Sequence, residues 1–187
     1  MGQFELDPDA ITTSYFACGD IAEIGPSELR EIGHLSRQAG GPARYNLHTS
    51  RHDDLHCMAI LQPAGVYAKP RLHTAKSKVF QFISGDMVVI TFGDNGEVRS
   101  LHRLAPGETL IVRISPGIFH TNCSLSEQAM YHEVMTGPYE PGQDDRQYAD
   151  FGPLVEDQET GRTWIHALIA QERPDLLSPG EAAIHRG

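Results

Sequence analysis

The sequence predicts an all-β protein, a jelly-roll barrel with a helix before it and a short helix after it. Short apolar segments recur at near-regular spacing between residues 55 and 136, which is typical of antiparallel sandwiches and barrels. Turn-forming residues separate the segments, and Asn95-Gly96 between two apolar runs is a strong hairpin signal. The expected strands are residues 55–62, 66–73, 78–84, 86–92, 97–103, 108–114, 118–123 and 129–136.

Helices are expected on both sides of these strands. Ser27 after Pro26 favours a helix start, the apolar residues that follow are spaced by three, and Gly40-Gly41-Pro42 ends the pattern. A second short helix is expected near residues 161–171. We therefore expect one domain. Its parts are an irregular arm at 1–23, a barrel domain at 24–160, and a helix with a mobile tail at 161–187.

Composition excludes several classes of protein. The 187 residues carry a formal charge of −10 without a cluster of Lys and Arg, which argues against nucleic-acid and membrane-surface partners. No apolar run approaches the length of a membrane span, and the first residues lack the features of a secretory signal. Three widely spaced cysteines form neither a disulfide framework nor a zinc motif, so we expect a reduced, cytoplasmic setting.

Two spaced motifs lie on the predicted strands. They read Gly65-x7-His73-x4-Lys78-x6-Gly85 and Pro116-Gly117-x2-His120-x-Asn122, a frame that resembles the paired motifs of a cupin barrel. Between about residue 24 and residue 160 the chain also resembles the WbuC-type cupin-fold metalloproteins. The segments that carry this resemblance are Arg44-Tyr45-Asn46-Leu47-His48, Pro63-x-Gly65-x-Tyr67-x-Lys69-Pro70, Pro116-Gly117-x2-His120-Thr121 and Glu133-Val134-x2-Gly137-Pro138-Tyr139-x-Pro141.

The resemblance implies a small β-barrel with one pocket, usually built around a divalent metal. It also implies an association with surface-polysaccharide or specialised-metabolite biosynthesis. Metal-binding cupins would place His, His, Glu and His at the four ligand positions. This chain has Arg71, His73, Lys78 and His120 there.

The two cations change the expected chemistry. Arg71 and Lys78 can replace the positive charge of a metal, and a divalent ion about 4 Å from one unit charge is repelled by about 8 kcal/mol at an effective dielectric of 20. We therefore expect no cofactor. If a metal is bound, we expect iron, nickel, copper or zinc with His73 and His120 as the remaining ligands. A neutral Lys78 or an outward-turned Arg71 would permit that alternative.

Strand periodicity places the candidate residues in one pocket. Residues i and i+2 of a strand share a face, so Arg71 and His73 point the same way. The turn and glycine frame indicates that they face into the barrel with Lys78, while His120 enters from the opposing sheet. The metal-free nucleotide-sugar epimerases of the cupin fold use a His base, a Tyr acid, and Arg and Lys for the enolate. By similarity of residue types, we expect His73, His120 and Tyr67 (or Tyr131) to be catalytic.

Further residues are expected to bind the substrate. A loop after the first helix carries Arg44, Asn46 and His48, and Arg44 suits a carboxylate or phosphate. Asn122 is a candidate hydrogen-bonding group in the pocket. Glu133 matches the family pattern and is expected to face inward; the alternative is that it forms a structural salt bridge with Arg71 or Lys78.

The leading function is metal-independent acid/base chemistry on a small anionic metabolite of specialised or carbohydrate metabolism, by an isomerase, epimerase, cyclase or lyase. An enzyme is favoured, and two alternatives stay open. One is a metal-dependent oxygenase or lyase with a rebuilt ligand set, and the other is a non-catalytic module that binds a small anion. Edge strands need cover, so we also expect a homodimer formed by sheet extension.

Overall fold

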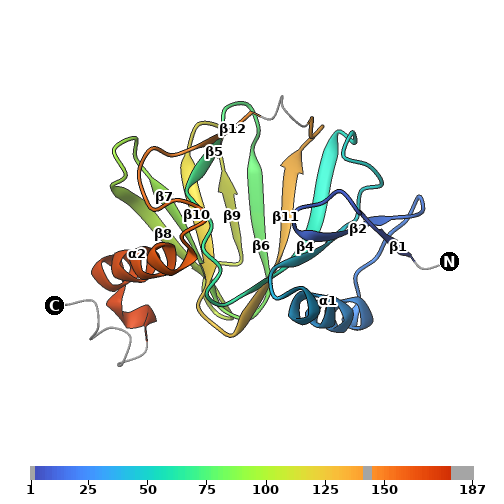
Figure 1. Ribbon diagram of the computed structural model, residues 1–187, viewed down its shortest axis with the longest axis horizontal. Coiled ribbons are helices and arrows are strands. Elements are labelled where there is room, and N and C mark those ends of the chain that lie inside the picture. Colours follow the sequence, from blue (N-terminus) through green and yellow to red (C-terminus); the bar gives the residue numbers. More distant parts are fainter. Residues whose placement is uncertain (1–2, 141–144, 178–187) are drawn as a thin grey trace.

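Two β-sheets face each other and enclose a barrel, with one helix outside each sheet (Figure 1). The computed structural model describes residues 3–140 and 145–177. The seven-stranded sheet has the order β1-β2-β3-β4-β11-β6-β9, and the five-stranded sheet has the order β12-β5-β10-β7-β8. The elements are β1 Phe4–Leu6, β2 Thr13–Ala17, α1 Pro26–Ala39, β3 Ala43–Asn46, β4 Leu55–Pro63, β5 Arg71–His73, β6 Lys78–Ser84, β7 Met87–Phe92, β8 Val98–Leu104, β9 Ile111–Ile114, β10 Phe119–Ser124, β11 Gln128–Thr136, β12 Arg146–Tyr148 and α2 Gln158–Glu172.

The eight expected strands all contain strand residues, but the second is much shorter than predicted. Residues 66–73 were expected to be extended, and only Arg71–His73 pair in β5. Pro70 has no backbone N–H to donate to a ladder. The backbone N–H of Tyr67 donates instead to the side-chain oxygen of Gln158 at the start of α2. This segment therefore connects the barrel to the outer helix.

The first residues of the chain are more ordered than the sequence indicated. We expected an irregular arm at 1–23, but β1 and β2 extend the seven-stranded sheet (Figure 1). β2 lies parallel to β3, with Tyr15 opposite Tyr45. That prediction was wrong because strands of three and five residues are too short to show a period. The arm covers the outer edge of β3.

Where a helix covers a sheet, the outer face of that sheet is apolar as well as the inner face. Phe80, Val89 and Tyr131 belong to the core inside the barrel. Val88 and Ile90, whose side chains point the other way along β7, pack under α2. On the seven-stranded sheet, the core between α1 and the outer face consists of Ile32, Ala43, Tyr45, Leu61 and Met130. Alternate residues along these strands therefore face the barrel interior and the outer helix in turn.

The second helix begins earlier than expected and is followed by ordered chain. α2 starts after Asp157, whose side chain accepts a hydrogen bond from the backbone N–H of Thr160. We expected a mobile tail directly after the helix, but Pro174–Leu176 form a 3-10 turn and Leu177 is buried. The remaining tail residues, and Pro141 of the family-like motif, lie outside the described residues. No helix in the described parts is long and apolar enough to cross a membrane.

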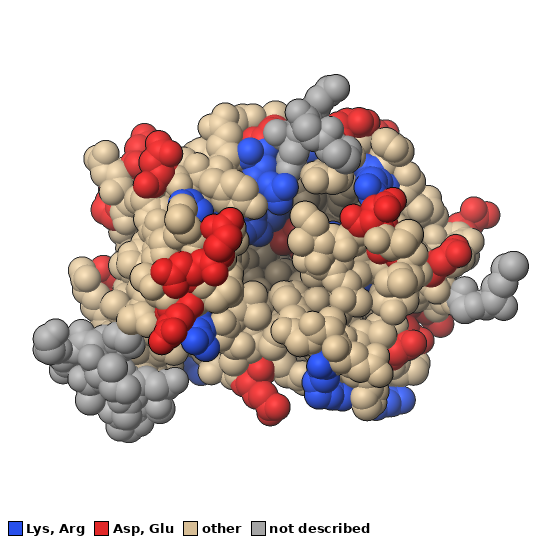
Figure 2. Space-filling model, viewed as in Figure 1, with Lys and Arg blue, Asp and Glu red and all other residues tan. Residues whose placement is uncertain are grey.

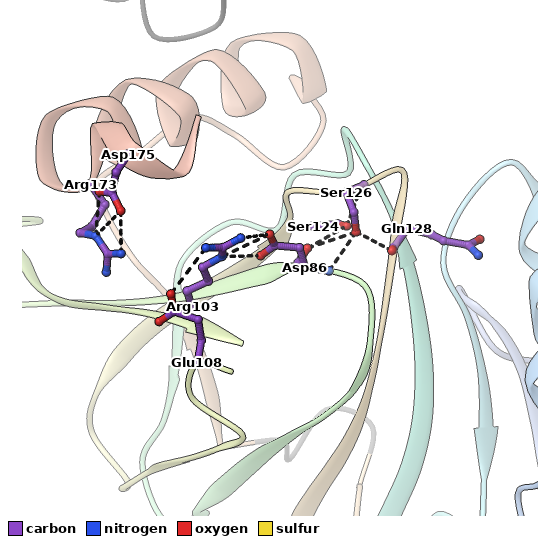
Figure 3. A network of polar contacts seen from close by, with 8 residues as sticks. All are labelled: Asp86, Arg103, Glu108, Ser124, Ser126, Gln128, Arg173 and Asp175. Carbon is purple, nitrogen blue, oxygen red and sulfur yellow. Dashed lines mark hydrogen bonds and ion pairs between the residues drawn. The ribbon is translucent and has the colours of Figure 1, made fainter. Parts of the chain in front are cut away.

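A polar network fixes the turn between β6 and β7 (Figure 3). Arg103 donates to both carboxylate oxygens of Asp86, from Nε at 3.0 Å and from a terminal nitrogen at 2.6 Å. The backbone carbonyl of Asp86 accepts from Leu125 N at 2.8 Å. Gly85 precedes it with a φ of +86°, and a Cβ there would lie 2.4 Å from the carbonyl oxygen of Gln128. The turn therefore requires glycine.

Candidate functional site

Charged and imidazole side chains from four strands meet inside the barrel. β5 carries Arg71 and His73, and the other strands supply Lys78, His120 and Glu133. Pairing of β10 with β5 sets His120 opposite Arg71, and the ring centroids of His73 and His120 are 6.4 Å apart. The structure therefore brings together five of the predicted site residues. Figure 2 shows a hollow near the middle of the viewed face, with basic side chains at its edge.

His73 is held by a carboxylate that sequence reasoning missed. Its Nδ1 lies 2.9 Å from Oδ1 of Asp145, just before β12. The other carboxylate oxygen accepts from the backbone N–H groups of Ala75 and Lys76. The hydrogen bonds from His73 and from this backbone lower the pKa of Asp145 to about 2, against the opposing effect of its burial. An ionised carboxylate accepts only, so the Nδ1–H of His73 donates to it.

His120 is the most buried ionisable group of the site. It is 1% exposed, and its Nδ1 lies 3.0 Å from the carbonyl oxygen of Ile118. Burial, with the nearby cations of Lys78 and Arg71, lowers the pKa of His120 to about 2. The ring therefore stays neutral at physiological pH. This argues against the expected role of His120 in taking up a proton and favours a role as a fixed hydrogen-bonding group.

Lys78 and Glu133 form a buried ion pair across β6 and β11. Their Nζ and Oε1 atoms are 3.3 Å apart, and the residues are 4% and 6% exposed. Burial lowers the pKa of Lys78 to about 8, while Glu133 opposes that effect. Glu133 faces inward as expected, and it forms the ion pair with Lys78 that was the alternative to substrate binding. The carboxylate compensates one cation of the pocket.

Two arginines add positive charge that no carboxylate neutralises at close range. Among the described residues, the half-buried guanidinium of Arg71 makes no hydrogen bond or ion pair. Arg44 donates from Nε to the hydroxyl of Ser14 at 2.6 Å. Burial lowers the pKa of Arg44, and the nearby carboxylate of Glu133 opposes this effect only in part. A guanidinium without a partner is suited to bind a carboxylate or phosphate of a ligand.

The structure does not bring Tyr67 into this group. Its ring packs against Trp164 and the backbone of Gly161 under α2, and its hydroxyl donates to the carbonyl oxygen of Pro153 at 3.0 Å. The expected catalytic role of Tyr67 is therefore corrected, because the residue faces away from the barrel interior. Tyr131 takes the inward position instead.

Two predicted binding residues, Asn122 and His48, have other partners, and a third, Asn46, is buried. Asn122 is 3% exposed and donates to Oε1 of Gln62 and, at 3.4 Å, to the hydroxyl of Tyr131. These contacts inside the barrel leave Asn122 little capacity for a ligand. His48 stacks on His56 with ring centroids 4.3 Å apart, so the structure groups it with that ring. Asn46 is buried at the end of β3, on the same strand face as Arg44.

The donors present do not fit the divalent metal that the family resemblance implies. The described residues contain no group of three His, Cys, Asp or Glu side chains placed to hold an ion. His73 and His120 supply two nitrogens, whereas the carboxylate of Glu133 is engaged by Lys78. Zinc and iron sites in proteins normally use three or more protein ligands. The nearby Arg71 adds repulsion that an incoming cation would have to overcome.

Comparison of the sequence with known families identifies no activity. A family model described as a domain of unknown function (DUF6016) matches residues 35–104, less than half of the chain. That match includes His73 and Lys78 but neither His120 nor Asp145. No curated protein matches the sequence.

Solved structures resemble the chain at low identity. CapF from Staphylococcus aureus, described as a capsular polysaccharide assembling protein, matches with a TM-score of 0.51 and 17% identity. That match covers 59% of this chain but only 30% of CapF, so the chain spans about a third of that protein. KdgF from Halomonas sp. matches with a TM-score of 0.42 and 18% identity, over 66% of this chain and 92% of KdgF. These are cupin-fold proteins, and with the two facing sheets the likeness to CapF shows that this chain has the cupin jelly-roll fold.

Proposed function

We propose that the protein is a small-molecule cupin enzyme, of the WbuC type, that moves a proton on an anionic metabolite. The observation that carries the proposal is the hydrogen bond between His73 Nδ1 and the ionised Asp145. It fixes the tautomer in which Nε2 of His73 is the basic nitrogen, and a carboxylate partner stabilises the imidazolium that forms on proton uptake. Asp145 is thus a positioning residue for His73.

Positive charge beside this imidazole supports an anionic substrate. Arg71 would hold a carboxylate or phosphate, and the Lys78 ammonium would stabilise negative charge that develops when a carbon-bound proton is removed. Isomerisation, epimerisation, cyclisation and elimination share that step. The neutral ring of His120 would orient the substrate without exchanging a proton.

The test has two stages. Thermal-shift screening against carboxylic acids, sugar phosphates and nucleotide sugars identifies a ligand, and proton NMR in deuterated water then follows exchange at carbon or conversion of that ligand. We expect His73→Gln to lose exchange and Asp145→Asn to lower kcat more than it raises KM. His52→Gln removes an exposed imidazole paired with Glu140 at 3.2 Å and is the matched control with unchanged exchange.

Two results would redirect the proposal. A ligand that binds wild type with no exchange or conversion would identify a non-catalytic module for a small anion. One equivalent of iron, nickel, copper or zinc in protein purified without a histidine tag would favour the metal-dependent alternative.

A homodimer is part of the same proposal. β9 ends the seven-stranded sheet, and Leu110 and Ile111 beside that edge are 58% and 57% exposed. An unpaired strand edge with exposed apolar side chains favours pairing with a second copy. Sedimentation equilibrium of wild type and Ile111→Lys measures this, and a monomeric wild type refutes it.

A further inference from the structure

One nitrogen of the site has no partner. Nε2 of His120 is fully buried, and it is the one buried side-chain nitrogen or oxygen atom of the described residues that lacks a hydrogen bond. The carbonyl of Ile118 can only accept, so Nδ1 of His120 carries the proton. Nε2 is consequently a lone pair that requires a donor.

A buried acceptor without a donor is rare in native proteins and usually marks a missing ligand, water or ion. The groups around this nitrogen narrow the possibilities. Lys78 and Arg71 both act electrostatically on His120, so the site disfavours a third cation such as a ligand ammonium. A ligand hydroxyl supplies a donor without adding positive charge.

We propose that the ligand of this site is a hydroxy acid, whose carboxylate binds the guanidinium of Arg71 and whose hydroxyl donates to Nε2 of His120. This inference rests on the proposed binding of an anionic metabolite and names its chemical class. A simple carboxylate or a phosphate dianion has no proton to give to Nε2. An amino acid carries an ammonium that the two cations disfavour.

Of the two cations that act on His120, Arg71 is the one that can move aside for a ligand. The nitrogen is covered in the structure, so a ligand reaches it only when a neighbouring side chain turns. Lys78 is held by Glu133, whereas Arg71 has no hydrogen bond or ion pair among the described residues and is only half-buried. Its guanidinium can therefore follow the carboxylate of the ligand without breaking a contact.

Acids that differ by one hydroxyl test the inference. Isothermal titration compares glycolate with acetate, and lactate with propionate, on metal-free protein. We expect the hydroxy member of each pair to bind at least about tenfold more tightly to wild type, since leaving a built acceptor unpaired penalises the analogue without the hydroxyl. His120→Phe should abolish this preference, whereas Arg71→Met should weaken both members by a similar factor. His34→Phe, on the exposed side of α1, is the matched control that keeps the preference.

A second measurement does not depend on a substitution inside the barrel. In protein labelled with nitrogen-15 at histidine, the Nε2 resonance of His120 should shift with glycolate and stay in place with acetate. Equal affinities for the two members of each pair, or an unshifted Nε2 resonance at saturation, would overturn the inference. A preference for hydroxy acids without turnover would leave this inference intact and refute the proposed enzyme activity. Turnover of an acid without a hydroxyl would support the enzyme activity and refute this inference.

Discussion

Substitutions at the buried ion pair between Lys78 and Glu133 test how much an unpaired charge inside the barrel lowers the stability of the protein. The perturbation is the set Lys78→Met, Glu133→Leu and the double variant, which keeps side-chain volumes similar. Each single change leaves one charge in a site where the wild-type residues are 4% and 6% exposed. Removing one member of a buried pair costs about 3–5 kcal/mol, whereas replacing both by apolar residues is often neutral or stabilising. We expect both single variants to be less stable than the double variant.

The pH dependence of the free energy of unfolding tests the burial of Lys78 independently of these single variants. The pKa of Lys78 is lowered from 10.5 to about 8, so between these values the unfolded chain binds more protons than the folded protein. The free energy of unfolding therefore rises with pH across that window. A shift of this size corresponds to about 3 kcal/mol. Relative to the double variant, wild type should gain roughly that amount between pH 7 and pH 10.5.

Urea unfolding monitored by the fluorescence of Trp164, the single tryptophan, measures these differences at each pH. Lys69→Met is the matched control, because Lys69 has no ion pair among the described residues and should change stability by less than about 0.5 kcal/mol. The reasoning is refuted if the difference between wild type and the double variant is flat with pH, or if the single variants are as stable as the double.

Three further outcomes are expected. Gly161→Ala should destabilise the protein by about 1–3 kcal/mol, because the added Cβ would lie 2.2 Å from the ring of Tyr67. Gly41→Ala, whose Cβ would meet open space, should be near neutral in the same urea titration. His48, whose pKa burial lowers to about 4, binds fewer protons folded than unfolded, so stability falls as pH drops from 6.5 to 4; His48→Gln should flatten that part of the curve. Arg103→Leu should lower stability by about 1 kcal/mol through loss of its double contact with Asp86, and an unchanged melting temperature would contradict this.

The barrel could be predicted from the sequence because its signals are local. Turn residues and alternation of apolar residues placed the barrel strands, and the parity of residues along them placed Arg71, His73 and Lys78 on inward faces. β2 and β3 were missed because their pairing is between short segments far apart in the chain, with no periodic signal. Tyr67 precedes Pro70, where the chain is not paired in the sheet. Its residue type alone could not show that it would pack outside the barrel.

The partners of the site residues were beyond sequence reasoning. Asp145 contacts His73 across 72 positions of the chain, and nothing near it in the sequence distinguishes it from other aspartates. Glu133 and Lys78 were both candidates, but only the register of β6 against β11 makes them partners. Burial of His120, which sets its protonation state, depends on the packing of all the surrounding strands.

The distribution of charge between outside and inside affects how fast an anion can arrive. The chain carries a formal charge of −10, and acidic side chains are spread over the face shown in Figure 2. Inside the barrel, the guanidinium of Arg71 has no ion pair among the described residues. An approaching carboxylate is repelled at long range and attracted only at contact. Salt screens the long-range part first, since the Debye length is about 10 Å at 0.1 M. The association rate of an anionic ligand should therefore increase with ionic strength, the opposite of the usual slowing in electrostatically steered binding.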